Sequence, residues 1–577
     1  MKYSKIPVAQ SIVALCVAKN IKHVVISPGS RNAPLTIGFT HHPEITPYSI
    51  VDERCAAFFA LGIAQQLQEP VAVVCTSGSA LLNYYPAVAE AFYSDIPLVV
   101  ISADRPIERI DIGDGQTIRQ KNVFENHILY SANLHSELVL EHAATDKKLQ
   151  QKQFESQKHN EREINLALNK ALEGKGPVHI NVPFYEPLYE TIENLTVNPL
   201  QIFPEKRERI YSEKELKPYA EIWNKAHRKI IIVGVLPPNA IEQKFLDQLA
   251  NDESVLVLTE TTSNINHPEF FTRIDTLIGP IERSEDAEAQ FIELQPEILL
   301  TFGGMIISKK IKSFLRNYQP KHHWHVDTKK AYNTFFCLNK HFEIAPNAFF
   351  ESFIPRIQKT KSDYAQHWKQ VKKQRQERHD IYMKEIPYSD LKAMQLIVPA
   401  VPENYNVQLG NSATVRYAQL FRWNENQKLF CNRGTSGIDG SVSTAVGAAV
   451  SNEDPTLLIC GDLSFIYDSN GLWNNYIPNN FRIIILNNSG GGIFRILPGH
   501  KNTRNFDTYF ETVHPYTAKQ ISEMYGFEYN SVASSEEIKQ QLDLFFNISE
   551  SPKILEIFTP RKINDEVLLE YFSFMKS

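Results

Sequence analysis

At 577 residues, the chain is too long for a single hydrophobic core and has room for three or four domains. Its net charge of −6 and its pI near 6.3 argue against a protein that binds nucleic acid by general electrostatic attraction. The composition, 43% hydrophobic and 22% charged, is that of globular domains, and no apolar run approaches the roughly 18–20 residues of a membrane span.

The N-terminal segment and the cysteines bear on the cellular compartment. Residues 11–20 are briefly apolar, but their spacing favours an amphipathic helix at the start of the fold over a secretory signal. The six cysteines form no C-x-x-C pair, and Cys75 and Cys460 lie within apolar runs, where cysteine usually acts as a small hydrophobic residue. We therefore expect a cytoplasmic protein with neither a disulfide framework nor a zinc site.

Strand-like and helix-like segments alternate along the chain at the spacing of βαβ units, which predicts an α/β fold with buried parallel sheets. The predicted strands of the first third are 23–27, 72–76, 98–102 and 179–183. A polar, helix-like segment, 145–173, precedes the last of these strands, and residues 190–215 have the composition of a linker.

The middle and last parts of the chain continue this alternation. The predicted strands of the middle part are 229–235, 254–260, 297–303 and 323–327. Residues 357–385 are strongly charged in a helical pattern, which is typical of a solvated connecting helix. We expect three α/β domains and one connecting helix, with the boundaries 1–190, 200–357, 358–385 (the helix) and 386–577.

An internal comparison indicates a duplication. Shifting the chain by 385 positions lays residues 54–75 on 439–460 without a gap, and Gly62 then meets Gly447. An acid-Pro pair precedes the strand in both copies. With five identities in 22 positions, chance similarity between two buried βα units stays an alternative. The comparison predicts that the first and third domains are related folds on either side of an unlike middle domain.

Two apolar runs of the last domain end in oxygen-bearing residues. TLLICG is followed by Asp462, and RIIIL is followed by two asparagines, the second being Asn488, and then by SGGG. In open α/β sheets, ligands bind beyond the carboxyl ends of the strands. An Asp oxygen, an Asn oxygen and a loop carbonyl form a hard-oxygen set that suits Mg²⁺, and a following helix start favours phosphate. The alternative is that Asp462 caps a helix and that NNSGGG is only a turn.

The pattern of G-D, about 25 residues and N-N resembles the diphosphate-binding motif of thiamine diphosphate enzymes, with Leu463 where the general motif has glycine. The longer stretch GDLSFIYDSNGL resembles one branch of them, the 2-succinyl-5-enolpyruvyl-6-hydroxy-3-cyclohexene-1-carboxylate (SEPHCHC) synthase family of menaquinone biosynthesis. Further stretches of the chain also resemble this family. Each is weak evidence alone, but together they are specific and span almost the whole chain. They are SPGSRNAPL (27–35), DERCAAFFALG (52–62), TSGSALLNYYPAVAEA (76–91), ISADRP (101–106), GNSATVR (410–416), NRGTSGIDG (432–440) and NNSGGGIF (487–494).

The resemblance implies a pyrimidine-binding first domain, a central domain and a diphosphate-binding third domain. It implies thiamine diphosphate as the cofactor, together with Mg²⁺ or Mn²⁺. In such enzymes the cofactor lies between the first domain of one copy and the third domain of another. A homodimer is therefore the smallest expected assembly, and a homotetramer is common, whereas nucleic acid and membrane partners are not expected.

For the cofactor, the resemblance implies specific residue roles. Glu53 would hydrogen-bond the aminopyrimidine ring, although from its tripeptide DER alone it reads as an acid at a helix start. Ile438 would hold the cofactor in a bent shape, and otherwise it reads as a core residue. The implied metal ligands are Asp462, Asn488 and the carbonyl of Gly490. Further implied cofactor contacts come from Leu463, Ser464, Ile493 and Phe494.

For the substrates, the resemblance implies 2-oxoglutarate and isochorismate. Both are dianions, and guanidinium groups bind carboxylates through two points. The expected cations and hydrogen-bond donors around the reaction are Ser30, Arg31, Arg105, Gln116, Lys309, Lys310, Ser412, Arg416 and Arg433. The family often has arginine at the second position of the basic pair, where this chain has Lys310, and such a pair is otherwise an ordinary solvated face.

The implied reaction is decarboxylation of 2-oxoglutarate followed by conjugate addition of the succinyl unit to isochorismate. Another thiamine diphosphate-dependent 2-oxo acid decarboxylase or carboligase, such as an acetohydroxyacid synthase type, stays an alternative, although the run IIIVGV carries no dinucleotide motif G-x-G-x-x-G. A non-catalytic phosphate-binding regulator on a duplicated α/β fold is a second alternative. A structural assembly protein ranks last, because it leaves the oxygen-bearing strand ends without a purpose.

Overall fold

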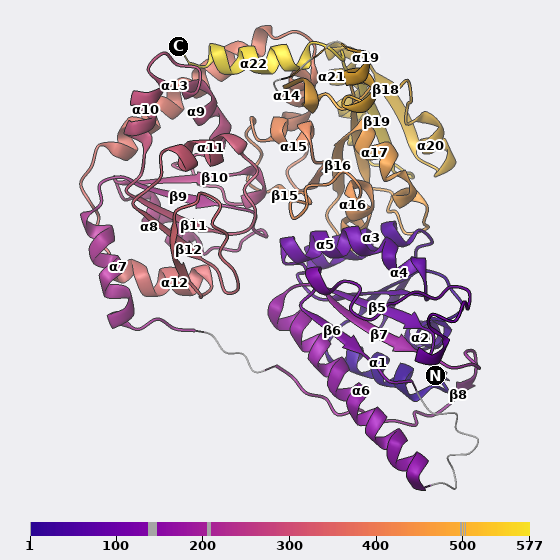
Figure 1. Cartoon of the computed structure of the whole chain (residues 1–577). Helices are drawn as coiled ribbons and strands as arrows, with labels where there is room; N and C mark the ends of the chain where they lie inside the picture. Colours follow the sequence, from indigo (N-terminus) through magenta and orange to yellow (C-terminus); the bar gives the residue numbers. More distant parts are fainter. Residues whose placement is uncertain are drawn as a thin grey trace.

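The computed structural model of the chain describes residues 2–136, 147–204, 209–496, 499, 501 and 503–576. Three parallel sheets, each covered by helices, form three bodies in chain order (Figure 1). The middle body and the third body lie side by side, and the first body packs beneath the third. This is the predicted α/β architecture with three units of buried parallel sheet.

The first body is built on a six-stranded parallel sheet in the order β3-β2-β4-β5-β7-β6. Its strands are β2 (His23–Ile26), β3 (Thr46–Ser49), β4 (Val71–Cys75), β5 (Leu98–Asp104), β6 (Tyr130–Asn133) and β7 (Val178–Pro183). Its helices are α1 (Pro7–Ala18), α2 (Ala33–Thr40), α3 (Glu53–Leu67), α4 (Ser79–Asn83), α5 (Tyr85–Ser94) and α6 (Lys147–Gly174). A short antiparallel pair joins β1 (Tyr3–Ser4) to β8 (Thr191–Ile192), near the start of the segment that leads to the middle body.

The middle body has a five-stranded parallel sheet in the order β10-β9-β11-β12-β13. Its strands are β9 (Lys229–Val233), β10 (Val255–Thr259), β11 (Ile298–Phe302), β12 (His322–Val326) and β13 (Leu338–Phe342). Its helices are α7 (Glu213–Lys225), α8 (Gln243–Ala250), α9 (Ile274–Ile281), α10 (Ala287–Leu294), α11 (Lys309–Asn317) and α12 (Pro346–Phe353). The predicted connecting helix is α13 (Tyr364–Glu385), which leads to the third body.

The third body has a six-stranded parallel sheet in the order β15-β14-β16-β17-β19-β18. Its strands are β14 (Asn406–Leu409), β15 (Lys428–Phe430), β16 (Thr456–Gly461), β17 (Arg482–Asn487), β18 (Glu528–Val532) and β19 (Lys553–Phe558). Its helices are α14 (Asp390–Ala400), α15 (Ala413–Ala418), α16 (Ser441–Val450), α17 (Asp462–Tyr467), α18 (Ile493–Ile496), α19 (Arg504–Tyr509), α20 (Lys519–Met524), α21 (Ser535–Phe545) and α22 (Asn564–Phe574).

The duplication predicted from the sequence appears in the topology. The first and third sheets have the same strand order once β2 is matched to β14 and each later strand to its counterpart. The shift of 385 positions carries the first residue of β4, Val71, onto the first residue of β16, Thr456. The middle sheet has a different order, as expected for an unrelated domain.

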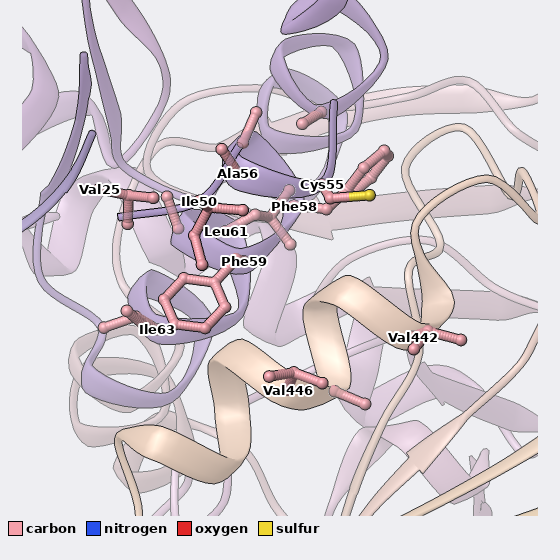
Figure 2. Packing of buried hydrophobic residues seen from close by; sticks show 14 of the residues in the cluster. Val25, Ile50, Cys55, Ala56, Phe58, Phe59, Leu61, Ile63, Val442 and Val446 are labelled. Atoms are coloured by element: carbon pink, nitrogen blue, oxygen red, sulfur yellow. The ribbon is translucent and has the colours of Figure 1, made fainter. Parts of the chain in front are cut away.

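The matched helices α3 and α16 pack against each other and join the first body to the third (Figure 2). Helix α3 starts at an N-cap, Asp52, whose side chain accepts a hydrogen bond from the backbone N–H of Cys55. Its apolar residues surround it on most sides, because it is buried between its own sheet and α16. One continuous buried cluster therefore includes Phe59 of α3 and Val446 of α16.

Polar contacts link the middle body to the first body and to the third body. The carboxylate of Asp95 in the first body pairs with Lys329 and Lys330 of the middle body, at 2.9 and 3.0 Å. Between the middle and third bodies, the Asn264 side chain exchanges two hydrogen bonds with the backbone of Leu429. All six cysteines are free thiols, and no helix in the described part of the chain is both long and apolar enough to span a bilayer.

Candidate active site

A cavity of about 670 Å³ lies at the carboxyl ends of the third sheet, facing the middle body. Its size falls within the roughly 300–1,000 Å³ that small-molecule sites occupy. Its walls come from the loops after β14, β16 and β17, the segment before α16, and helices α9, α11 and α22. The predicted site residues that line it are Lys309, Lys310, Ser412, Arg416, Arg433, Ile438, Asp462, Leu463, Ser464, Asn488, Gly490, Ile493 and Phe494. We call it the catalytic cavity.

Asp462 lies at the end of β16 and is the first residue of α17, so its carboxylate sits on the cavity wall. One carboxylate oxygen accepts the N–H of Leu463 at 2.6 Å, and the other accepts the N–H of Gly490 at 2.9 Å. His514 Nε2 lies 3.4 Å from the second oxygen. These contacts fix a buried carboxylate between the ends of β16 and β17. The segment from β16 to β17 contains only the short helix α17 and a 3₁₀ turn, rather than one long crossover helix.

Asn488 follows β17 and is oriented from behind by a carboxylate. Its amide nitrogen donates to Asp390 Oδ2 at 2.8 Å. In the described part of the chain no donor is bonded to its amide oxygen, which therefore stays available for a ligand on the cavity side. Asp390 is buried, which raises its pKa to about 6, and Thr559 Oγ1 donates to its other oxygen.

Glycines let the backbone approach the cavity closely. Gly490 has a φ of +151°, and a Cβ placed on it would lie 2.6 Å from the carbonyl oxygen of Glu511. A Cβ on Gly461 would meet no atom within 4 Å, since that position faces the cavity. The donor set and this glycine lining fit a metal-diphosphate group, because they offer oxygen ligands and backbone N–H groups without side chains in the way.

The remaining predicted cofactor contacts line the same cavity. Ser464 is buried, and its hydroxyl donates to the carbonyl of Ile438 at 3.3 Å and to the Ser441 hydroxyl at 3.1 Å. Ile493 and Phe494 begin α18 directly after the glycine run. Ile438, Ile493 and Phe494 add apolar side chains to the walls of the cavity.

Two half-buried guanidinium groups give the catalytic cavity a positive end. Arg433 donates from Nη1 to Asn411 Oδ1 at 2.6 Å, and its Nε has no hydrogen-bond partner among the described residues. Burial lowers the pKa of Arg416, and repulsion from Arg433 lowers it further. A dianionic ligand would relieve both the desolvation and the repulsion.

The basic pair of the middle body also reaches this cavity. Lys309 and Lys310 are the first residues of α11, which Ser308 caps by accepting the N–H of Ile311. Lys310 is bonded to Glu282, and Lys309 is exposed on the wall. The loop before α11 is held by the buried carboxylate of Glu260.

Ser412 is held in an unusual backbone conformation, with a φ of +72° and a ψ of −124°. Non-glycine residues adopt this region rarely and at a cost on the order of 1–3 kcal/mol, and such strain clusters at functional sites. Ser412 lies directly before α15, which carries Arg416. The strain thus coincides with a residue predicted from the sequence to contact substrate.

Five predicted residues, all in the first body, do not line the catalytic cavity. We call them the N-terminal cluster: Ser30, Arg31, Glu53, Arg105 and Gln116. Arg31 donates to Glu186 at 2.9 Å and to the carbonyl of Phe184 at 3.1 Å. Arg105 lies 3.9 Å from the same carboxylate and donates to the carbonyl of Gly115, next to Gln116.

Glu53 and Ser30 have local partners within the first body. Glu53 is the first residue of α3, half-buried, and accepts a weak hydrogen bond of 3.4 Å from the Asn83 amide. The Ser30 hydroxyl accepts a hydrogen bond from Tyr189 at 3.1 Å. The structure of one chain thus separates the predicted residues into two groups.

Several residues around the catalytic cavity were not predicted from the sequence. Asp390, Asn411 and Asp275 line the catalytic cavity, and buried Glu260 accepts hydrogen bonds from Ile307 and Ser308. Glu90 of α5 is nearly fully buried, and its carboxylate accepts the N–H groups of Gly434 and Thr435, directly after Arg433. Two of them carried a sequence signal, since Asn411 lies inside the stretch GNSATVR and Glu90 lies inside TSGSALLNYYPAVAEA.

Comparisons with known proteins match segments in all three bodies of the chain. Family models match residues 6–131 (thiamine pyrophosphate enzyme, N-terminal TPP binding domain), 206–405 (middle domain of thiamine pyrophosphate) and 410–557 (thiamine pyrophosphate enzyme, C-terminal TPP binding domain). Three relatives carry the name 2-succinyl-5-enolpyruvyl-6-hydroxy-3-cyclohexene-1-carboxylate synthase. The protein of Christiangramia forsetii is 74% identical over all of both chains, that of Flavobacterium psychrophilum 54% over 99% of both, and that of Porphyromonas gingivalis 36% over 96% of this chain and 95% of its own. The chain therefore belongs to the thiamine pyrophosphate enzymes and, among them, to the 2-succinyl-5-enolpyruvyl-6-hydroxy-3-cyclohexene-1-carboxylate synthase family.

Proposed function

We propose that the chain catalyses the thiamine diphosphate-dependent decarboxylation of 2-oxoglutarate and the addition of the remaining succinyl unit to isochorismate, giving SEPHCHC and carbon dioxide. The observation that carries this proposal is the catalytic cavity itself. It joins the oxygen-bearing strand ends Asp462 and Asn488 to the half-buried guanidinium groups of Arg416 and Arg433. One end suits a metal-diphosphate, and the other suits a dianionic substrate.

The cofactor and its metal would be held by the third body. Asp462, Asn488 and the carbonyl of Gly490 are the proposed ligands for Mg²⁺ or Mn²⁺, with diphosphate and water completing the shell. Ser464, Leu463 and the glycine backbone would contact the diphosphate, and Ile438 would support the cofactor's bent shape. When bound, thiamine diphosphate supplies the carbon nucleophile that attacks the keto carbon and the electron sink for loss of carbon dioxide.

Two groups of side chains would serve the reaction. Glu53 would hold a proton on its carboxylate and exchange it with the aminopyrimidine ring, with Ile493 and Phe494 excluding water from the reacting carbon. Arg31, Arg105, Arg416, Arg433, Lys309 and Lys310 would bind the carboxylates of the two dianions, with Ser30, Gln116 and Ser412 as neutral hydrogen-bond partners.

The proposed active site requires a second copy of the chain. Glu53 and the rest of the N-terminal cluster do not line the catalytic cavity of their own chain. Large apolar side chains are exposed near both groups: Ile107 and Ile112 on the first body, and Tyr509, Phe510 and Tyr516 on the third. Such exposed apolar surface is typical of an interface. We therefore propose a homodimer or homotetramer that brings the N-terminal cluster of one copy to the catalytic cavity of another.

The first test is turnover of the purified full chain with thiamine diphosphate, Mg²⁺, 2-oxoglutarate and isochorismate. We expect SEPHCHC to form and Glu53→Gln to lose at least about 100-fold in rate, a typical contribution of acid-base catalysis. Glu69→Gln, at an exposed acid after α3, is the matched control and should keep wild-type activity. Carbon dioxide release from a different 2-oxo acid without any need for isochorismate would support the alternative decarboxylase or carboligase.

A subunit-mixing experiment tests the shared site. Glu53→Gln and Asp462→Asn are each expected to be inactive alone. If the site joins two copies, a mixed dimer has one site with both changes and one with neither. Unfolding and refolding an equal mixture should then restore about a quarter of the wild-type activity, since about half of the dimers are mixed. No recovery in a mixture shown to exchange subunits would contradict a site shared between copies.

A further inference from the structure

A second large cavity in the described part of the chain holds none of the predicted site residues. Its volume is about 1140 Å³, and it lies between the middle body, helix α13 and the third body. The middle body contributes Glu260 and the segments 264–270 and 272–273, and the third body contributes the end of α14 and residues 421–425. We call it the interdomain cavity.

Basic side chains gather on the walls of this cavity. Arg273, Lys372, Lys373 and Arg422 all line it, and none of the four forms an ion pair with a carboxylate among the described residues. Lys369 also lines it, but its charge is matched by Glu269 at 2.5 Å. The interdomain cavity therefore contains several positive charges that lack an internal counter-ion.

The contacts that these cations do make are to neutral groups. Lys372 donates to the carbonyls of Pro268 and Phe270 at 2.7 and 2.8 Å. Arg273 is bonded to the side-chain oxygen of Gln376. Burial lowers the pKa of Lys372 to about 8. The Glu269 carboxylate opposes this shift, whereas the neighbouring cations Arg273, Lys369 and Arg422 add to it. Neutral partners orient the side chains without cancelling their charge.

The acidic side chains on the same walls are already hydrogen-bonded or ion-paired within the protein, or are exposed to solvent. Glu260 accepts the backbone N–H groups of Ile307 and Ser308, Glu269 is paired with Lys369, and Glu403 accepts from the side chain of Asn424. Glu425 is exposed. Glu269 lies close enough to Lys372 to raise its pKa but is already paired with Lys369, and no carboxylate of the walls forms an ion pair with any of the four cations in the described part of the chain.

We propose that the interdomain cavity binds a small polyanion that carries two or more phosphate or carboxylate groups. Arginine and lysine together suit such a ligand, because the guanidinium group binds its oxygens through two points and the ammonium group adds a compact charge. The amide groups of Asn266 and Asn424, each of which donates one hydrogen bond within the walls, can donate a second one to a ligand. The inference rests on the walls of this cavity alone and does not depend on the proposed reaction.

Calorimetric titration of the full chain, saturated with thiamine diphosphate and Mg²⁺, tests the proposal with two probes, inorganic phosphate and tricarballylate. We expect at least one probe to bind at a single site per chain and to raise the melting temperature. Which probe binds more tightly distinguishes a phosphate ligand from a carboxylate ligand. The double variant Lys373→Gln/Arg422→Gln, at two exposed positions, should weaken binding at least about tenfold, since two charge-assisted contacts are removed.

Lys384→Gln is the matched control, because Lys384 is an exposed lysine of α13 that does not line the cavity. It should bind the probe as the wild type does. Absence of saturable binding of both probes below about 10 mM would overturn the proposal, since that affinity is too weak for a built site. Equal binding by the wild type and by a folded double variant would also overturn it, because the probe would then bind elsewhere.

Discussion

Gly62 of α3 and Gly447 of α16 lie where these two helices cross, and the shift of 385 positions carries the first glycine onto the second. A Cβ on Gly62 would lie 2.1 Å from the carbonyl oxygen of Thr444, and a Cβ on Gly447 would lie 2.0 Å from the carbonyl oxygen of Phe59. The same shift carries Phe59 onto Thr444. The two copies of the duplicated unit thus meet through equivalent surfaces (Figure 2), and each supplies the glycine that lets the other's backbone approach.

Gly447→Ala should therefore destabilise the junction between the first and third bodies. The new methyl group meets backbone on the partner helix, which cannot rotate away, and overpacking of this kind costs about 1–3 kcal/mol or more. We expect a melting temperature several degrees below that of the wild type in a thermal unfolding scan. Gly115→Ala is the control, because its added methyl meets no atom within 4 Å. Equal melting temperatures for the wild type and Gly447→Ala would show that the helices separate easily at this point.

The backbone strain at Ser412 leads to a prediction with two substitutions. Ser412→Gly should relieve the positive φ and raise stability by about 1 kcal/mol, once the greater freedom of glycine in the unfolded chain is subtracted. Ser412→Ala removes the same hydroxyl without relieving the strain. Both variants should lose activity to a similar extent in the turnover assay, but only the glycine variant should melt at a higher temperature. A gain in stability from alanine as well would mean that the backbone is not strained there.

Glu90 is predicted to position the loop that carries Arg433. Its carboxylate accepts the N–H of Gly434 at 2.8 Å, and the N–H and hydroxyl of Thr435 at 2.6 and 2.9 Å. Glu90→Gln would turn an amide N–H₂ toward one of these donors and leave it unpaired. We expect kcat/KM for 2-oxoglutarate to fall at least about tenfold, mainly through KM, since hydrogen bonds to charged groups contribute about 1.5–3 kcal/mol.

The control for Glu90 lies on the same helix. Ser94 donates to Glu90 Oε1 at 2.7 Å, and its hydroxyl lies close to Gly434 but makes no hydrogen bond to the loop in the described part of the chain, so Ser94→Ala should leave KM within about twofold. If Glu90→Gln lowered kcat with an unchanged KM, the loop would not be positioning a substrate-binding group. Glu90→Asp, with the charge retained on a shorter side chain, should fall between the wild type and the glutamine variant.

Residues at strand ends and buried carboxylates that orient the site differ in how far they can be predicted from the sequence. Asp462 and Asn488 each follow an apolar run directly, and parallel strands bring their carboxyl ends to one edge, so local pattern predicts their proximity. Glu90 and Gly434 are 344 positions apart, and Asp390 and Asn488 are 98 apart. The first pair depends on how two domains dock and the second on how α14 packs within the third body, and no local periodicity encodes either. The sheets could therefore be predicted, whereas the carboxylates that orient the site could not.

Asp468 is a second buried carboxylate at the junction of the two related bodies. Its oxygens accept the N–H and the hydroxyl of Ser443 at 2.7 and 2.9 Å, at the start of α16, and Arg54 of α3 lies 3.6 Å away. Burial raises its pKa from 3.8 to about 7. The protonated form is thus favoured in the folded protein relative to the unfolded chain.

A carboxyl with a raised pKa contributes most to stability below its unfolded value, and the contribution is lost as the pH rises toward the folded value. As the pH rises from about 4 to about 7, the titration of Asp468 should therefore lower the free energy of unfolding of the wild type. About 2–3 kcal/mol of this decrease falls between about pH 5 and pH 7. In thermal scans at pH 5 and pH 8, Asp468→Asn should show a smaller difference between the two melting temperatures than the wild type, because asparagine does not titrate. Asp543→Asn, at an exposed acid of α21, should keep the wild-type difference. An equal difference in Asp468→Asn and the wild type would mean that this carboxylate is ionised in the folded protein at both pH values.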